Sequence, residues 1–148
     1  MSTIRLSMPV AFFIENCLTS GLPLETIIDS IKQQQFSVFK DNVQDREMDF
    51  NERYQVAEQL GEDWETAIKS GYELKWLHMN GLKKLLNFRF NKVADTDYLQ
   101  DGYVISSLSL NHFEYEILSS MVNSQWNVFS DDTTEGRYRI ELKYKNVM

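Results

Sequence analysis

The last part of the chain alternates between apolar and charged residues, and this pattern constrains the fold more than any other feature. Within residues 137–145 the apolar positions are Tyr138, Ile140, Leu142 and Tyr144. A period of two puts these side chains on one face of a strand and the charged side chains on the other. Residues 126–130 are predicted to pair with this strand through the turn-rich residues 131–136. The apolar face of such a hairpin needs other elements to cover it.

Helical periodicity before the hairpin supplies those elements and predicts an α+β protein, with four to five helices packed on a small antiparallel sheet. A first helix follows from the apolar stripe around Cys17, and a second begins at Pro23. Residues 51–70 predict a third helix, which Gly71 is placed to end, and residues 72–92 predict a fourth.

The last predicted helix opens with Asn111 and Glu114, a pair that can cap the first turn from both sides. Residues 103–105 are expected to form a short strand before it. The inward residues of this helix are predicted to be Phe113, Ile117, Leu118 and Met121.

Length and composition favour one domain spanning residues 1–148 with a substantial aromatic core. The chain is 43% hydrophobic and 13% aromatic, which argues against disorder. Cys17 is its one cysteine, so an intrachain disulfide is excluded and a reducing, cytoplasmic location is expected. No apolar run reaches the roughly 18–20 residues that span a bilayer, so a membrane partner is not expected.

The net charge of −7 is distributed unevenly along the chain. Residues 41–71 carry nine acidic and three basic side chains, whereas residues 72–92 carry five basic and one acidic. An acidic surface repels phosphate backbones and attracts cationic partners. This distribution makes a protein ligand more favourable than a nucleic acid.

The leading functional hypothesis is therefore a non-catalytic acidic module that binds a basic protein, as an inhibitor, antidote or nucleic-acid mimic does. Carboxylates give such a surface its specificity, and an aromatic side chain can anchor the contact. The candidate partner-binding residues are Asp45, Glu47, Asp49, Glu52, Glu62, Asp63, Trp64 and Glu65.

A DNA-binding transcription regulator is the alternative hypothesis. Residues 56–61 followed by Trp64 resemble the first half of a helix-turn-helix, but Glu62 stands where that motif usually has an apolar residue. The capped helix and hairpin also have the order of a winged helix, although the hairpin turn is acidic. The candidate nucleic-acid-binding residues are Lys83, Lys84, Arg89, Lys92, Arg137, Arg139 and Lys143.

Motifs for catalysis or metal binding are weak in this sequence. His78 and His112 are the only histidines, and one cysteine does not complete a zinc ligand set. The acidic residues 95–101 resemble a calcium loop, but Gly102 falls outside the required spacing. With no phosphate-binding glycine loop and no nucleophile elbow, neither a cofactor nor a metal is expected, and an unrecognised small enzyme is the third hypothesis.

Overall fold

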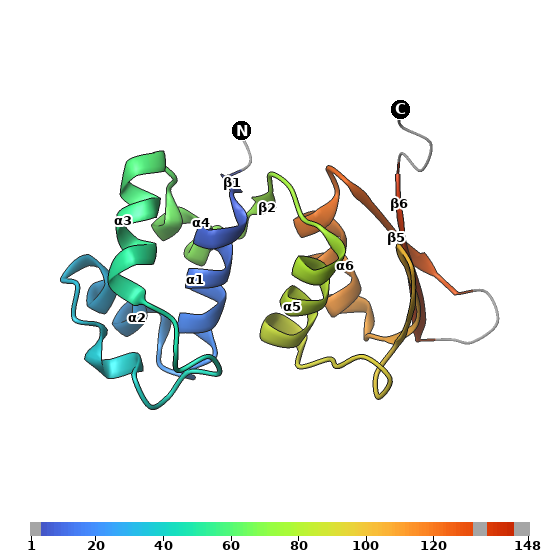
Figure 1. Cartoon of the computed structure of the whole chain (residues 1–148), viewed down its shortest axis with the longest axis horizontal. Helices are drawn as coiled ribbons and strands as arrows, with labels where there is room; N and C mark the ends of the chain where they lie inside the picture. The colour runs from blue at the N-terminus through green and yellow to red at the C-terminus, as the bar shows by residue number, and fades with distance from the viewer. Residues whose placement is uncertain (1–3, 132–135, 144–148) are drawn as a thin grey trace. The chain divides into compact units, whose positions relative to one another are not determined.

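The computed structural model of the chain describes residues 4–131 and 136–143. The fold divides into two compact units, Met1–Lys75 and Trp76–Met148, and each is described by itself. Within the described residues, six α-helices and a four-stranded antiparallel sheet confirm the predicted α+β class, and the predicted hairpin at the end of the chain is present (Figure 1). The expectation of one domain over the whole chain stays a prediction.

Unit 1 is helical and is built around α1. Its elements are β1 (Arg5–Leu6), α1 (Met8–Leu18), α2 (Leu24–Lys32), the 3-10 helix η1 (Phe36–Phe39), α3 (Phe50–Leu60), α4 (Trp64–Ser70) and β2 (Glu73–Leu74). The ring of Phe50 lies 5.6 to 6.3 Å from the rings of Phe13, Phe36 and Phe39, measured between centroids. Cys17 is fully buried, and burial raises the pKa of its thiol, which is the environment of an unreactive cysteine.

A short parallel pairing joins the beginning and the end of unit 1. Arg5 lies opposite Glu73 and Leu6 opposite Leu74. The Nε atom of Arg5 is 3.4 Å from Oε1 of Glu73, and both leucines are buried. The sequence gives no alternating pattern at either segment, so this pairing was not predicted.

Residues 51–70 do not form the single helix that their periodicity predicts. Gly61 adopts the left-handed conformation with φ of 64°, and its N–H donates to the carbonyl of Glu58 while the next N–H reaches Ala57. These two hydrogen bonds form a Schellman motif, which ends α3. Asp63 then caps α4 by accepting a hydrogen bond from the N–H of Thr66. The helix count is therefore six instead of four or five.

The predicted helix over residues 72–92 begins late, at Met79. Residues 73–74 are used as β2, and His78 stops the helix from extending further back. The Nδ1 atom of His78 accepts a hydrogen bond of 2.7 Å from the N–H of Gly81, so this histidine is the N-cap.

Unit 2 is a four-stranded antiparallel sheet in the order β3-β4-β6-β5. Its elements are α5 (Met79–Phe90), β3 (Leu99–Asp101), β4 (Val104–Ser109), α6 (His112–Val122), β5 (Trp126–Ser130) and β6 (Arg137–Leu142). Both helices lie on one side of the sheet, and no helix of this unit covers the other side (Figure 1). The inner face carries a buried row formed by Ile105, Ile140 and Val128.

Local signals around α6 are confirmed in part. Asn111 and Glu114 form the predicted capping box. Leu118 and Met121 are buried as predicted, but Phe113 is 71% exposed, because its position in the first turn lies off the inward stripe. The predicted strand at residues 103–105 is longer, running Val104–Ser109 with a bulge, and its partner β3 was missed. Tyr144 and Lys145 lie outside the described residues.

Candidate functional site

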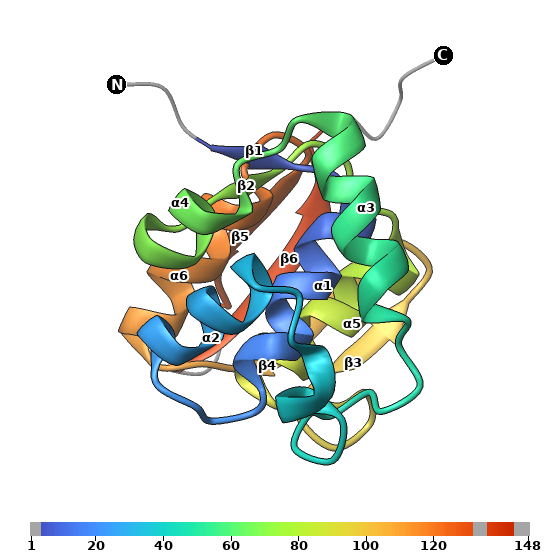
Figure 2. The same ribbon diagram turned by 90° about the vertical axis from the view of Figure 1, so that its left-hand side faces the viewer.

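The eight predicted partner-binding residues lie in two groups at opposite ends of α3. Asp45, Glu47, Asp49 and Glu52 belong to the segment that leads into α3 and to its first turn; Glu62, Asp63, Trp64 and Glu65 follow its last turn. Figure 2 shows α3 running between these two segments. With 11 residues, the helix separates the groups by roughly 16 Å at 1.5 Å per residue.

The first group lies on a loop that α1 holds in place. The side chain of Asn16 accepts a hydrogen bond of 2.9 Å from the N–H of Asp45 and donates one of 2.8 Å to its carbonyl. The carboxylate of Asp49 caps α3 through the N–H of Glu52, 3.1 Å away. Glu47, Asp49 and Glu52 are exposed, and within the described residues no lysine or arginine forms an ion pair with them.

Glu62 of the second group is buried and serves the fold of its own unit. Its Oε1 atom accepts hydrogen bonds from the N–H and the hydroxyl of Ser7, each 3.0 Å long. The Nζ atom of Lys75 lies 2.8 Å from the other oxygen, Oε2. The side chain is 3% exposed, so Glu62 stabilises the start of α1, and its charge is not accessible to a partner.

Glu65 is also matched by cations of its own unit. Lys69 and Lys32 place their Nζ atoms 2.9 Å and 3.1 Å from its carboxylate oxygens. The hydrogen bonds from Lys69 and then Lys32 lower the pKa of Glu65. This carboxylate therefore stays ionised, but its charge is already compensated.

Asp63 and Trp64 differ in what they present to solvent. Asp63 is exposed, and hydrogen bonds from the N–H and the hydroxyl of Thr66, 3.0 and 2.7 Å long, lower its pKa. Trp64 is 6% exposed, with its ring 6.4 Å from that of Tyr54. This inward position leaves Trp64 unable to anchor a partner directly.

The turn between α3 and α4 forms a pocket of 380 Å³. Its lining residues are Lys32, Glu58, Gly61, Glu62, Asp63, Trp64 and Glu65. Glu58 was missed as a candidate, although its place one turn before Gly61 is the signal that could have found it. Because Glu58 and Asp63 are exposed and lack an ion pair in the described part of the chain, the pocket can receive a cationic side chain.

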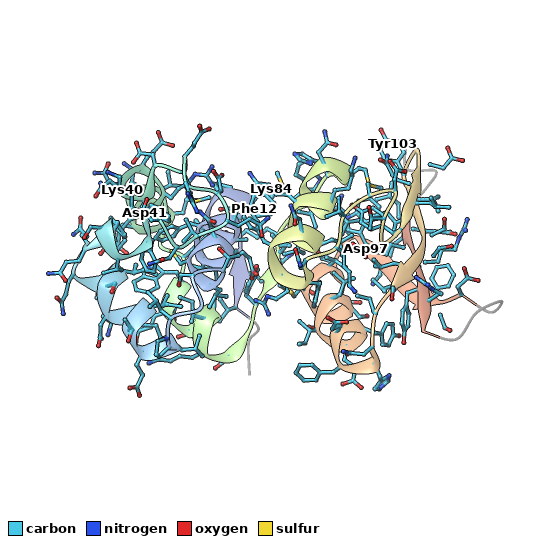
Figure 3. The ribbon with its side chains drawn as sticks, turned by 90° about the horizontal axis from the view of Figure 1, so that it is seen from below. Phe12, Lys40, Asp41, Lys84, Asp97 and Tyr103 are labelled. Atoms are coloured by element: carbon cyan, nitrogen blue, oxygen red, sulfur yellow. The ribbon has the colours of Figure 1, made fainter. Side chains whose placement is uncertain are left out.

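The candidate nucleic-acid-binding residues of α5 do not share one face. Lys83 donates a hydrogen bond of 3.1 Å to Gln100, and the Nζ atom of Lys84 lies 5.7 Å from the ring centre of Phe88. Figure 3 labels Lys84 on α5. Arg89 projects from a different side of the helix, and Lys92 follows its C-cap.

Of the remaining cations, Arg137 and Arg139 lie on β6, and Lys143 follows the last residue of that strand. Strand alternation puts Arg137 and Arg139 on the sheet face opposite the helices, because Ile140 faces the core. Arg139 is 2.5 Å from the carboxylate of Glu141, and Lys143 donates to the side chain of Asn123 at 3.0 Å. The basic residues are thus divided between the two sides of the sheet.

The titratable groups suited to catalysis have structural tasks. His78 caps α5, and Nε2 of His112 lies 2.6 Å from the carboxylate of Glu116 one helical turn away. The pocket beside His78 has a volume of 460 Å³ and is lined by Met79, Asn80, Gln100, Gly102 and Tyr103, with no carboxylate. Figure 3 shows Tyr103 between β3 and β4. His78 and Tyr103 are the titratable side chains of this lining, and the Nδ1 atom of His78 is occupied by the helix cap.

The described residues contain no group of three or more histidine, cysteine, aspartate or glutamate side chains placed to hold a metal ion. Among the same residues, no helix combines the length and the apolar character that crossing a membrane requires. Comparison of the chain with protein-family models, with curated proteins and with solved structures finds no match.

Proposed function

We propose that unit 1 is a non-catalytic binding module for a basic protein, which it contacts through α3 and the segments at its two ends. The acidic character of the chain belongs almost entirely to this unit. Residues 1–75 carry thirteen acidic and seven basic side chains, whereas residues 76–148 carry nine and eight. A cationic partner is therefore steered toward unit 1.

The observation that carries the proposal is a set of exposed carboxylates along α3 that form no ion pair within the described part of the chain. They are Glu47, Asp49, Glu52, Glu58 and Asp63. All five are exposed, and among the described residues none forms an ion pair. Lys32, Lys69 and Lys75 form their ion pairs with Glu62 and Glu65, and the charge of Lys69 also acts on Asp63 without an ion pair.

The other predicted residues support this surface from within. Glu62 and Trp64 hold the turn between α3 and α4, and Asp45 holds the loop before α3. A partner that uses lysine or arginine to bind phosphate matches the surface, because the same side chains can pair with carboxylates. An inhibitor or antidote that covers a nucleic-acid-binding surface is the role most consistent with this chemistry.

Two charge-matched variants test the proposal. The first neutralises unit 1 through Glu47→Gln, Glu52→Gln and Glu58→Gln, which spare both helix caps. The control neutralises three exposed acids of unit 2 through Asp95→Asn, Asp101→Asn and Glu116→Gln. Each variant raises the net charge by the same amount, so a difference between them reports position and not total charge.

The assay is affinity purification from the native cell at low and high ionic strength, with captured proteins identified by mass spectrometry. We expect a basic protein to be captured by the wild type and by the control, and to be lost with the unit 1 variant. High salt should release it, because the screening length falls from about 10 Å at 0.1 M ionic strength to about 3 Å at 1 M. Capture that survives both high salt and the unit 1 substitutions contradicts the proposal.

A further inference from the structure

A pocket of 350 Å³ in unit 2 is formed by the loop before β3, the bulge of β4 and the start of β6. Two carboxylates line it from the loop, those of Asp95 and Asp97, and Asp97 is labelled in Figure 3. A guanidinium lines it from the first residue of β6, Arg137. Leu99, which is 55% exposed, adds an apolar side chain. Opposite charges and an apolar surface therefore line one pocket.

The charged side chains of this pocket do not pair with one another. None of the ion pairs formed by the described residues includes Asp95, Asp97 or Arg137. The guanidinium donates one long hydrogen bond of 3.4 Å to the carbonyl of Ser107, which leaves most of its N–H groups available. Oδ2 of Asp97 accepts a hydrogen bond of 2.8 Å from the N–H of Val93, and no described residue donates to its other oxygen. A ligand can therefore pair with groups of both signs here.

The backbone holds these groups in an uncommon arrangement. Asp95 and Ser107 have φ of 70° and 57°, in the left-handed region that residues other than glycine seldom adopt. Ser107 also lies in the bulge of β4, and bulges often redirect side chains next to binding sites. Burial and then the charges of Asp95 and Asp97 raise the pKa of Tyr98, which lines the same pocket. The two carboxylates thus act on one point of the pocket.

We propose that this pocket binds a free amino acid with a cationic side chain, for which lysine is the model. One guanidinium and two carboxylates match the one carboxylate and two ammonium groups of lysine at neutral pH. Arg137 binds the α-carboxylate through its N–H groups, while Asp95 and Asp97 bind the two ammonium groups. Leu99 contacts the aliphatic stem. The volume falls within the range of roughly 300–1,000 Å³ that small-molecule pockets have.

The charge pattern favours this ligand over three other classes. Arg137 repels a metal cation, and the two aspartates repel a phosphate or a nucleic acid. A lysine inside a protein chain has its carboxyl group in a peptide bond, so it offers Arg137 no carboxylate. This inference concerns unit 2 and does not rest on the function proposed for unit 1.

A ligand series on the wild-type full chain is the first test. Titration with L-lysine is followed by the amide chemical shifts in NMR, and we expect saturable shifts within residues 93–99 and at Ser107, with a dissociation constant of about 1 mM or below. Cadaverine is lysine without the carboxylate, and L-norleucine has the same stem without the side-chain ammonium. Each should bind roughly tenfold or more weakly than L-lysine, because it loses one charge-assisted contact.

Charge-matched variants are the second test, with circular dichroism to verify that each is folded. Arg137→Gln should weaken L-lysine binding roughly tenfold and should remove the preference for L-lysine over cadaverine. Asp95→Asn should weaken L-lysine binding to a similar extent, and asparagine tolerates the left-handed backbone of this position. Arg139→Gln and Asp101→Asn change the same charges on the same sheet outside the pocket, so both should match the wild type.

The inference is overturned if L-lysine causes no saturable shifts at concentrations up to about 10 mM. It is overturned equally if cadaverine binds the wild type as tightly as L-lysine does, because Arg137 then takes no part. Equal weakening by Arg139→Gln and Arg137→Gln assigns binding to the general charge of the sheet and also overturns it. Since the ligand series uses the wild type, the decision does not depend on the folding of any variant.

Discussion

Replacing Glu62 by alanine tests whether this carboxylate stabilises the fold of unit 1. The substitution removes two hydrogen bonds from Ser7 to an ionised acceptor, each worth about 1.5–3 kcal/mol. Lys75 is 48% exposed and can return to water, so its ion pair adds no more than about 1 kcal/mol. Relief of the buried charge offsets part of the loss. We expect Glu62→Ala to lower the free energy of unfolding by about 2–4 kcal/mol.

The companion variants separate the two contacts of this carboxylate. Glu62→Gln keeps an oxygen acceptor for Ser7 and should cost roughly half as much, because neutral hydrogen bonds are about half as strong. Lys75→Met should cost less than about 1 kcal/mol. Urea denaturation followed by far-ultraviolet circular dichroism measures all three. A loss below about 0.5 kcal/mol for Glu62→Ala, or an equal loss for Lys75→Met, refutes the reasoning.

Three further predictions concern the ends of helices. Gly61→Ala should cost about 1 kcal/mol of stability in urea denaturation, because φ is +64° while no atom lies within 4 Å of the added carbon. Asn111→Ala should cost about 1 kcal/mol by breaking the capping box with Glu114, whereas Asn111→Asp should cost little. The hydrogen bonds from Thr66 lower the pKa of Asp63, so their stabilisation is complete above the ordinary aspartate pKa and is lost as pH falls through the lowered value. A carboxyl titration by NMR should show this lowered pKa, and Asp63→Asn should flatten the acid dependence of stability.

The features that the sequence predicted well are those decided by neighbouring residues. The alternation around Ile140 predicts a strand with one apolar and one charged face, whatever the rest of the fold is. The reciprocal cap of Asn111 and Glu114 needs only three intervening positions along the chain. Gly61 was harder to interpret, because a glycine can continue a helix at modest cost or end it, and hydrophobic periodicity continues across it.

The candidate site was less predictable because charge along a sequence does not report how each charge is used. Glu58 and Glu62 are four residues apart, yet Glu62 is buried and hydrogen-bonded to Ser7, whereas Glu58 is exposed. The deciding contact spans 55 positions, so no local pattern contains it. The same limit applies to the basic residues, which β6 and α5 place on different sides of one sheet.

The pairing of Arg5–Leu6 with Glu73–Leu74 means that unit 1 begins and ends side by side. Neighbouring strands lie about 4.8 Å apart, a gap that a very short linker can bridge. A segment with adjacent ends can be spliced into a surface loop of an unrelated carrier without stretching that loop, or closed on itself and reopened elsewhere. The helical half of this chain therefore meets the geometric condition for such an insertion, because its first and last strands are paired.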